Sequence, residues 1–144
     1  MSETRRTVVA SSEKAWGVLA DGWLYPLWVV GATRMRDVDE SWPAVGSRLH
    51  HSAGVWPVVI NDNTEVLAVE PGRSLSLRAR GWPLGEADVV ITLTDLGGSR
   101  TEVALEETTT AGPGVLLPDS VEDALLGWRN RETLRRLAFV IEGR

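Results

Sequence analysis

Several residue types that carry common chemistries are scarce in this sequence. Cysteine is missing, and lysine occurs once, as Lys14, among 144 residues. Without cysteine the chain forms no disulfide, and no thiolate is available as a metal ligand or nucleophile. The formal net charge is −5, whereas a nucleic-acid site needs a cationic stripe that neutralises phosphates. We therefore expect no nucleic-acid partner.

Long apolar runs are missing as well. No run approaches the roughly 20 residues that cross a bilayer, and the opening segment MSETRRTVVASSE lacks the apolar core of a secretory signal. These absences predict a cytoplasmic protein without stable membrane insertion. Either a monomer or a homodimer is compatible with the sequence.

Histidine is nearly as scarce, with only His50 and His51. Adjacent side chains on a strand point to opposite faces, so these two cannot chelate one metal together. The sequence also has no Gly-rich phosphate loop, no H-E-x-x-H, no EF-hand loop and no G-x-S-x-G. We expect neither a metal nor a cofactor.

The residues that are present form an ordinary globular composition, 43% hydrophobic and 24% charged. A chain of this length can bury one substantial core. No repeat, low-complexity segment or linker divides it. We expect one α+β domain over residues 1–144.

The spacing of apolar residues predicts one strand, two short helices and then a series of strands. An edge strand over residues 3–10 leads to Ser11 or Ser12, which can cap a helix over 12–20. A second short helix is expected over 23–30. Six further strands follow, over residues 33–38, 47–53, 58–69, 74–80, 86–96 and 100–109. The connections are short, so the strands should form an antiparallel meander.

A long helix is predicted from Asp119 or Ser120 to Glu142. Its apolar side chains form two stripes that are displaced around the helix. The first contains Val121, Ala124, Leu125 and Trp128, and the second contains Leu134, Leu137, Ala138 and Ile141. Such an offset is expected when a helix crosses a strongly curved sheet and its halves meet different walls.

Three segments resemble motifs of the START-like (SRPBCC) superfamily. Residues 8–16, VVASSEKAW, resemble its opening V-x-A-P-x-E-x-V-W, although Ser11-Ser12 replaces the proline. Residues 25–28, YPLW, resemble its Y-P-x-W helix, and residues 64–71, TEVLAVEP, resemble its long fourth strand and following turn. The resemblance is strongest to the bacterial polyketide cyclase/dehydrase and lipid-transport branch.

The resemblance implies the helix-grip fold, in which a curved antiparallel sheet of about seven strands wraps around a long C-terminal helix. It also implies a cavity between sheet and helix that receives an apolar small molecule. Members include lipid carriers, hormone receptors, aromatase/cyclases and chaperone activators, so the function must be argued from the site.

Seven tryptophans supply candidate walls for such a cavity. Trp56 and Trp82 each lie beside a proline in a strand connection, where they either cover the cavity mouth or pack within a loop. Trp128 lies on the first helix stripe, which should face the sheet, so it contacts either core or ligand. Trp16 and Trp28 are interpreted as core.

Alternation along the strands selects inward-facing polar residues. His51 shares its face with Leu49 and Ala53, and Glu107 continues the inward series Val103 and Leu105. His51 is either a structural or a catalytic histidine.

If Leu67 and Val69 face inward, then Glu65, Asn63 and Asn61 do so too. A β-bulge would shift this alternation and place Glu65 in water instead. The basic cluster Arg129, Arg131, Arg135 and Arg136 reads as a solvated helix face, although Arg131 and Arg135 could also pair with inward acids.

Two functions follow from these candidates. In the first, the protein binds or carries an apolar or aromatic molecule such as a lipid, quinone or polyketide-like ring. Its ligand-binding residues would then be Trp56, Asn63, Glu65, Trp82, Glu107 and Trp128, with His51 orienting a polar group. In the second, His51 or Glu107 acts as general acid–base in a cyclase/dehydrase reaction, with its pKa shifted by burial.

Overall fold

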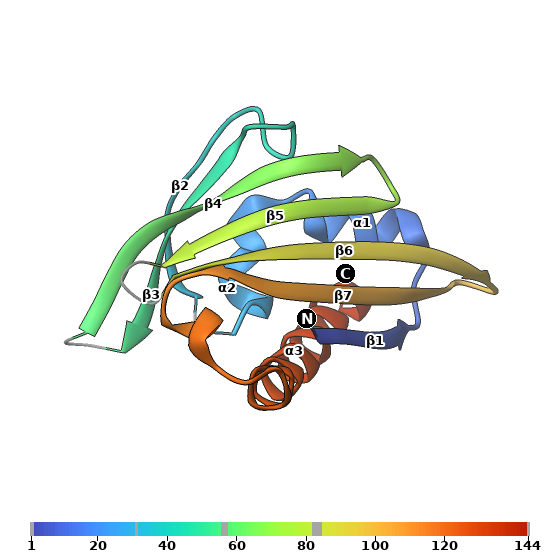
Figure 1. The fold of residues 1–144 in the computed structure, drawn as a ribbon. Coiled ribbons are helices and arrows are strands. Elements are labelled where there is room, and N and C mark those ends of the chain that lie inside the picture. The colour runs from blue at the N-terminus through green and yellow to red at the C-terminus, as the bar shows by residue number, and fades with distance from the viewer. Residues whose placement is uncertain (1, 31, 56–57, 82–84, 144) are drawn as a thin grey trace.

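The computed structural model describes residues 2–30, 32–55, 58–81 and 85–143. These residues form one antiparallel sheet whose seven strands run in the spatial order β1-β7-β6-β5-β4-β3-β2 (Figure 1). The strands are β1 (Ser2–Val8), β2 (Ala32–Val38), β3 (Arg48–Val55), β4 (Val58–Glu70), β5 (Ser74–Gly81), β6 (Gly85–Gly97) and β7 (Arg100–Ala111). The predicted meander is therefore confirmed, with β1 returning to pair with β7.

The helices also follow the predicted order. They are α1 (Ser12–Leu19), the 3-10 turn η1 (Gly22–Leu24), α2 (Tyr25–Trp28), the 3-10 turn η2 (Pro113–Leu116) and α3 (Asp119–Glu142). Ser11 caps α1, because its hydroxyl accepts a hydrogen bond from the Lys14 amide at 3.2 Å. The second helix is shorter than predicted, a 3-10 turn followed by one α-helical turn. Among the described residues, no helix is both long and apolar enough to span a membrane.

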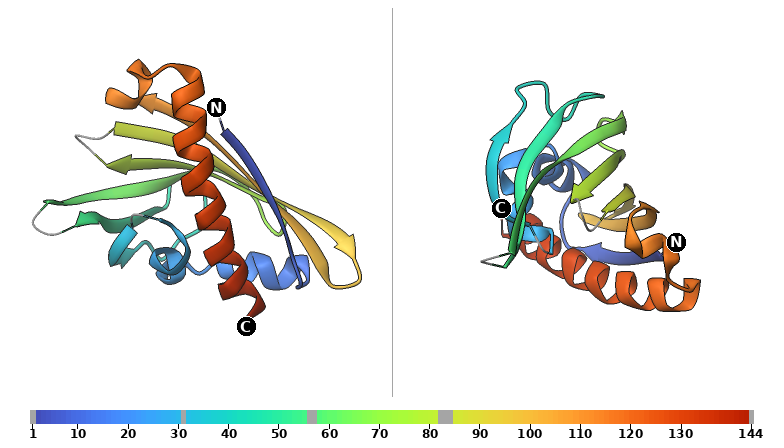
Figure 2. Two further views of the ribbon diagram at one scale, coloured as in Figure 1. Left: turned by 90° about the horizontal axis from the view of Figure 1, so that it is seen from below. Right: turned by 60° about the vertical axis from the view of Figure 1, so that its left-hand side comes forward.

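Helix α3 crosses the concave side of the sheet (Figure 2). It packs mainly along β1 and against α2. This arrangement leaves the middle strands β4, β5 and β6 curving away from the N-terminal half of the helix, as the right-hand view of Figure 2 shows. The observed architecture is the α+β helix-grip arrangement that the sequence predicts.

The apolar core gathers at one end of the concave side, where α1, the sheet and the C-terminal half of α3 meet. Its fully buried side chains include Val18, Leu19, Leu75, Ile91, Val103, Leu134, Leu137 and Ile141. Residues that alternate with these on β5, β6 and β7 point to the convex face. One stripe of α3 and one face of the sheet thus supply most of the hydrophobic stabilisation.

A β-bulge in β4 changes which face its residues occupy. Val66 pairs with Leu77 and Ala68 with Ser76, so Leu67 is an extra residue without a partner on β5. Val66 is buried and Leu67 is 36% exposed. Strand β3 begins at Arg48, which pairs with Glu65, so the β4 residues after Glu65 have no partner on β3. The Val66 amide donates a hydrogen bond to the carbonyl of Ser47, which precedes β3.

The prediction that β4 points Glu65, Asn63 and Asn61 inward is therefore wrong. It assumed that Leu67 faces inward and continued unbroken alternation from there. With the extra residue in place, Thr64 occupies the inner face, fully buried, and Glu65 occupies the outer face.

The first apolar stripe of α3 is also placed differently from the prediction. Val121, Leu125 and Trp128 are exposed, Trp128 by 66%. The buried face in that half of the helix instead carries Gly127 and Asn130. Because α3 lies along the edge strand β1, its N-terminal half turns small and polar residues to the interior. The second stripe is buried as predicted.

Candidate functional site

A set of polar side chains occupies the concave side next to the apolar core. We call it the inner polar cluster, and it consists of Tyr25, His51, Thr64, Glu107, Arg129 and Asn130. These residues come from α2, β3, β4, β7 and α3, so the sheet and both helices contribute. Polar groups are costly to bury unless they are paired, so each partner and each missing partner is informative.

The hydroxyl of Thr64 joins two aromatic rings of the cluster. His51 Nε2 lies 2.8 Å from Thr64 Oγ1, and the Tyr25 hydroxyl lies 3.2 Å from the same oxygen. The Tyr25 and His51 rings also stack, with centroids 5.6 Å apart and planes inclined by 23°. The β4 bulge makes this contact possible, because it turns Thr64 to the inner face.

Burial shifts the ionisation of both rings toward their neutral forms. Desolvation lowers the pKa of His51 below its ordinary value of 6.5, with smaller contributions from Arg36 and His50 and opposition from Asp62. Desolvation also raises the pKa of Tyr25, and Glu107 adds to that rise. At neutral pH the interior therefore presents a neutral imidazole beside a neutral phenol.

Glu107 lies inward on β7, as its alternation predicts, and its side chain is only 6% exposed. Arg129 of α3 donates a hydrogen bond from Nη2 to the carboxylate, and the two form an ion pair. The Arg129 side chain is 39% exposed, so the pair reaches from the interior to the surface. A buried carboxylate is tolerated when it is paired in this way.

Sequence reasoning missed Arg129 as a site residue. It grouped Arg129 with the solvated face of α3 because the neighbouring residues are charged. The two alternatives named for Glu107, Arg131 and Arg135, are exposed, and Arg135 bonds Glu132. The signal that could have found it is the alternation along β7, which points Glu107 inward. A buried carboxylate needs a basic partner, and the nearby arginines lie on α3.

Three buried polar atoms of the described residues have no hydrogen-bond partner. They are Trp28 Nε1, His51 Nδ1 and Asn130 Nδ2. Trp28 contacts Tyr25 edge-on, with ring centroids 5.3 Å apart, so the rings of Trp28 and His51 both contact the same tyrosine. Native interiors rarely leave such atoms unsatisfied, and each one calls for an explanation.

The concave side next to the cluster is not fully covered. Ala79, Ala87 and Val89 share the inner face with buried Leu77 and Ile91, yet all three remain partly accessible to solvent. The unpaired polar atoms and the accessible apolar surface thus occur in the same half of the interior.

Two of the three β4 residues that were predicted to face inward, Asn63 and Glu65, form a separate network on the convex face. Arg80 donates to Asn63 Oδ1 at 3.0 Å and to Glu65 Oε1 at 3.1 Å. Glu65 also pairs with Arg48 on β3. Their side chains are engaged with one another, so Asn63 and Glu65 are not brought to the inner polar cluster.

Of the three tryptophans predicted to line the cavity, the structure describes Trp128. Trp56 and Trp82 lie outside the described residues. Trp128 is on the outer side of α3 and does not face the sheet. Of the predicted ligand-binding residues, the structure brings Glu107 to the interior, together with His51.

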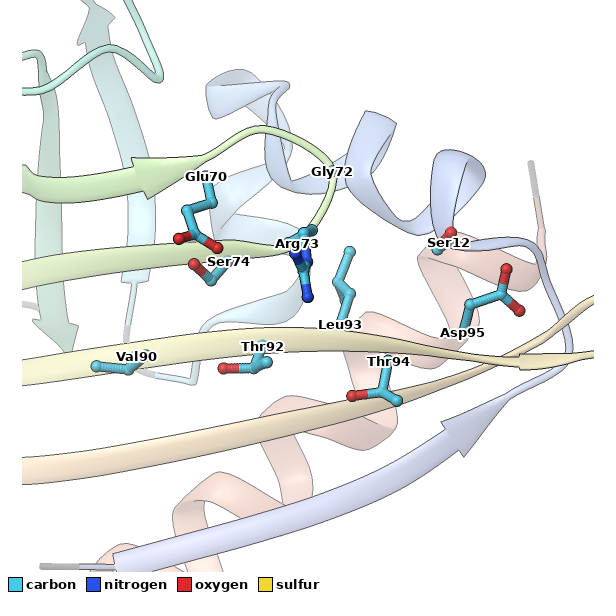
Figure 3. Close-up of a pocket in the computed structure, with 10 residues that line it drawn as sticks. All are labelled: Ser12, Glu70, Gly72, Arg73, Ser74, Val90, Thr92, Leu93, Thr94 and Asp95. Carbon is cyan, nitrogen blue, oxygen red and sulfur yellow. The ribbon is translucent and has the colours of Figure 1, made fainter.

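A hollow of ≈ 460 Å³ lies elsewhere, beside the turn between β4 and β5 (Figure 3). Its walls include Arg73, Thr92, Thr94 and Asp95, all of them exposed. It contains none of the residues of the inner polar cluster and no buried polar atom without a partner. We therefore do not assign the site to this hollow. Within the described ranges, no group of three histidine or acidic side chains is arranged to hold a metal ion.

No protein-family model matches the sequence, and no curated protein matches it. Solved structures do match. The Zhui aromatase/cyclase from Streptomyces sp. R1128 is 18% identical, with a TM-score of 0.71 over 97% of this chain and 92% of that chain. Ara h 8.0201 is 15% identical, with a TM-score of 0.69 over 99% and 97% of the two chains.

The chain has the START-like, helix-grip fold. A third structure, the di-domain ARO/CYC BexL from the BE-7585A biosynthetic pathway, agrees with this at 17% identity. Its TM-score is 0.73 over 98% of this chain and 46% of that chain. The START-like resemblance seen in the sequence is thereby confirmed as a fold, and identities this low establish nothing more specific.

Proposed function

We propose that the protein binds a small molecule that has an apolar, ring-containing body and one polar group. The body occupies the concave side against Ala79, Ala87 and Val89, and the polar group reaches His51 and Asn130. Lipids, quinones and polyketide-like rings are ligands of this kind. The protein works in the cytoplasm as a monomer or homodimer.

One observation carries this proposal: buried polar atoms without partners stand beside accessible apolar surface on the inner face. A bound polar group supplies the missing partners, and an apolar body covers the surface. The neighbours give further support, because aromatase/cyclases share the fold.

A matched pair of substitutions on β6 tests the location of the ligand. Val89 faces inward and Val90 faces outward, and both are partly buried. Val89→Trp should fill the concave space and weaken the binding of 2-naphthol at least tenfold, measured by isothermal titration calorimetry. Val90→Trp should leave binding unchanged. Equal affinities for both variants, with unchanged melting temperatures, would contradict the proposed location.

The two histidines provide a second test that needs no substitution. Both imidazoles can be followed by two-dimensional ¹⁵N nuclear magnetic resonance. Addition of 2-naphthol should shift the His51 resonances, because Nδ1 gains a partner. The His50 resonances should stay in place, because His50 bonds Asp39 at 3.0 Å on the other face.

A cyclase/dehydrase activity is the second candidate, and the neutral His51 held by Thr64 and Tyr25 favours it. A neutral imidazole can polarise a carbonyl or exchange a proton at the carbon next to it. Glu107 is a weaker candidate for the base, because Arg129 occupies its carboxylate.

The two candidates respond differently to His51→Gln. In a binding protein this change alters the affinity for the ligand by several-fold and abolishes no reaction. In an enzyme it reduces kcat by about 10²–10⁴-fold, the usual contribution of general acid–base catalysis. Product formation from a linear poly-β-ketone thioester, compared with affinity for 2-naphthol, separates these outcomes.

A further inference from the structure

The hydrogens in the Tyr25–Thr64–His51 contact can be arranged in three ways. Thr64 has one hydroxyl hydrogen and two lone pairs, and Oγ1 lies within hydrogen-bond distance of both the Tyr25 hydroxyl and His51 Nε2. In the first arrangement, Tyr25 donates to Thr64 and Thr64 donates to His51 Nε2. In the second, His51 Nε2 donates to Thr64 and Thr64 donates to Tyr25. In the third, Tyr25 and His51 Nε2 both donate to Thr64.

The three arrangements leave different groups unsatisfied. In the first, both hydroxyl hydrogens are used, and the only unpaired group is the N–H at His51 Nδ1. In the second and third, a hydroxyl hydrogen, of Tyr25 or of Thr64, has no acceptor among the described residues, and the lone pair at His51 Nδ1 is unpaired as well. Tyr25, His51 and Thr64 are all buried, so each unpaired group carries a cost of desolvation. The first arrangement leaves the fewest unpaired groups and is favoured, so His51 presents an N–H at Nδ1.

A second donor comes from α3. Asn130 is 2% exposed and its Nδ2 has no partner. One turn further along the same face, Thr133 Oγ1 accepts a hydrogen bond from the Val30 amide, two residues after α2. The face of α3 that carries Asn130 therefore packs against α2 and the residues that follow it. The unpartnered Trp28 Nε1 is also a donor, since an indole nitrogen accepts no hydrogen bond.

The charged groups around these donors are of both signs. Arg129, the neighbour of Asn130, is paired with Glu107. Asp62, on the inner face opposite His51, raises the proton affinity of His51, whereas Arg36 and His50 lower it. A site of donors without excess positive charge suits an uncharged acceptor better than an anion.

We infer that the polar group of the ligand is an uncharged hydrogen-bond acceptor, such as the carbonyl oxygen of a fused-ring ketone or quinone, which receives hydrogen bonds from His51 Nδ1 and Asn130 Nδ2. Tyr25 and Thr64 are positioning residues that set the tautomer of His51. This inference rests on the proposed function and specifies what that site selects.

The tautomer is tested in the free protein by ¹⁵N nuclear magnetic resonance of the histidines. His51 should show the Nδ1–H form, and Thr64→Ser should keep it. Tyr25→Phe removes the donor at the head of the chain, so the Nδ1–H preference should be lost while His50 stays unchanged. An Nε2–H form of His51 in the native protein would overturn the inference.

Selectivity is tested with three two-ring probes: 1-tetralone, tetralin and 1-naphthoate. The ketone should bind at least tenfold more tightly than either the hydrocarbon or the carboxylate. In the Asn130→Leu variant, the ratio of the affinity for 1-tetralone to the affinity for tetralin should fall several-fold. The control variant Leu125→Ala, on the exposed side of α3, should leave this ratio unchanged.

The outcomes separate this inference from the proposed function. If tetralin or 1-naphthoate binds as tightly as 1-tetralone, the acceptor preference is wrong, although the interior still binds a ring compound. If none of the three binds, both the inference and the proposed function fall.

Discussion

The two halves of the interior differ in how completely their apolar surface is buried and their buried polar atoms are hydrogen-bonded. Around the C-terminal half of α3, Leu134, Leu137 and Ile141 pack against the sheet and are almost fully buried. Around the N-terminal half, Asn130 and His51 keep buried atoms without partners, and Ala79 stays partly accessible. One helix and one sheet thus form both a fully buried apolar core, which we call the closed half, and a polar end with unpaired atoms, which we call the unfinished half.

The comparison indicates that the two halves of α3 have different roles, one in stability and one in ligand binding. The closed half supplies the burial that offsets the entropy of folding, at roughly 25 cal/mol for each Å² of apolar surface. The unfinished half contributes less and keeps groups that a ligand can satisfy. Stabilising and binding functions should therefore be separable by substitution.

The largest effect is expected in the closed half. Leu137→Ala leaves a cavity among fully buried side chains and should cost about 2–5 kcal/mol of unfolding free energy. Urea unfolding followed by tryptophan fluorescence measures it. The exposed variant Leu125→Ala is the control and should change stability by about 0.5 kcal/mol or less. Equal losses for the two would remove the distinction between the halves.

A smaller loss is expected when the ion pair of the polar half is broken. Arg129→Met leaves the Glu107 carboxylate buried alone, which should cost about 1–3 kcal/mol because Arg129 itself is partly solvated. Urea unfolding measures this loss. The double variant Arg129→Met/Glu107→Leu should recover most of the stability. A double variant as unstable as the single one would show that the pair contributes more than charge compensation.

A gain in stability is expected when an unpartnered atom is removed. Asn130→Leu replaces a buried amide by an apolar group of similar size and should raise the unfolding free energy by about 1 kcal/mol. Thermal unfolding would detect the gain. A clear loss of stability would mean that the Asn130 side chain is already satisfied in the free protein.

Stability should also depend on pH through His51. Its folded pKa lies below 6.5, so between the two pKa values the unfolded chain holds more protons than the folded one. The contribution is fully present above pH 6.5 and is lost as pH falls toward the folded pKa. His51→Gln should flatten this slope in urea unfolding between about pH 5 and 8.

The smallest effect is expected at Trp128. Its side chain is 66% exposed on the outer side of α3, so Trp128→Ser should change stability by about 0.5 kcal/mol or less. Affinity for 2-naphthol should not change either. Loss of binding in this variant would restore the sequence-based prediction that Trp128 contacts the ligand.

The fold was predictable because its signals are local and agree with one another. Ser11 caps α1, apolar residues alternate along β5 to β7, and short turns link the strands. The inward position of Glu107 followed from the same alternation. His51 was also selected correctly as an inward residue, since β3 has no irregularity in its pairing with β4.

The remaining site residues depended on long-range geometry. The bulge at Leu67 follows from where β3 begins beside β4, which the sequence of β4 alone does not reveal. Asn130 and Arg129 turn inward because α3 lies along β1, and a helical pattern does not specify the partner of each face. The unpartnered atoms became visible only once all neighbours were placed.

The extra residue in β4 has a consequence for comparing this chain with others of the same fold. A relative that lacked the counterpart of Leu67 would present the opposite side of every preceding β4 residue, so Asn63 and Glu65 rather than Asp62 and Thr64 would face the interior. Two sequences could then be almost identical along β4 and still enclose different chemistry. Alignments that ignore this single insertion would transfer binding residues to the wrong surface.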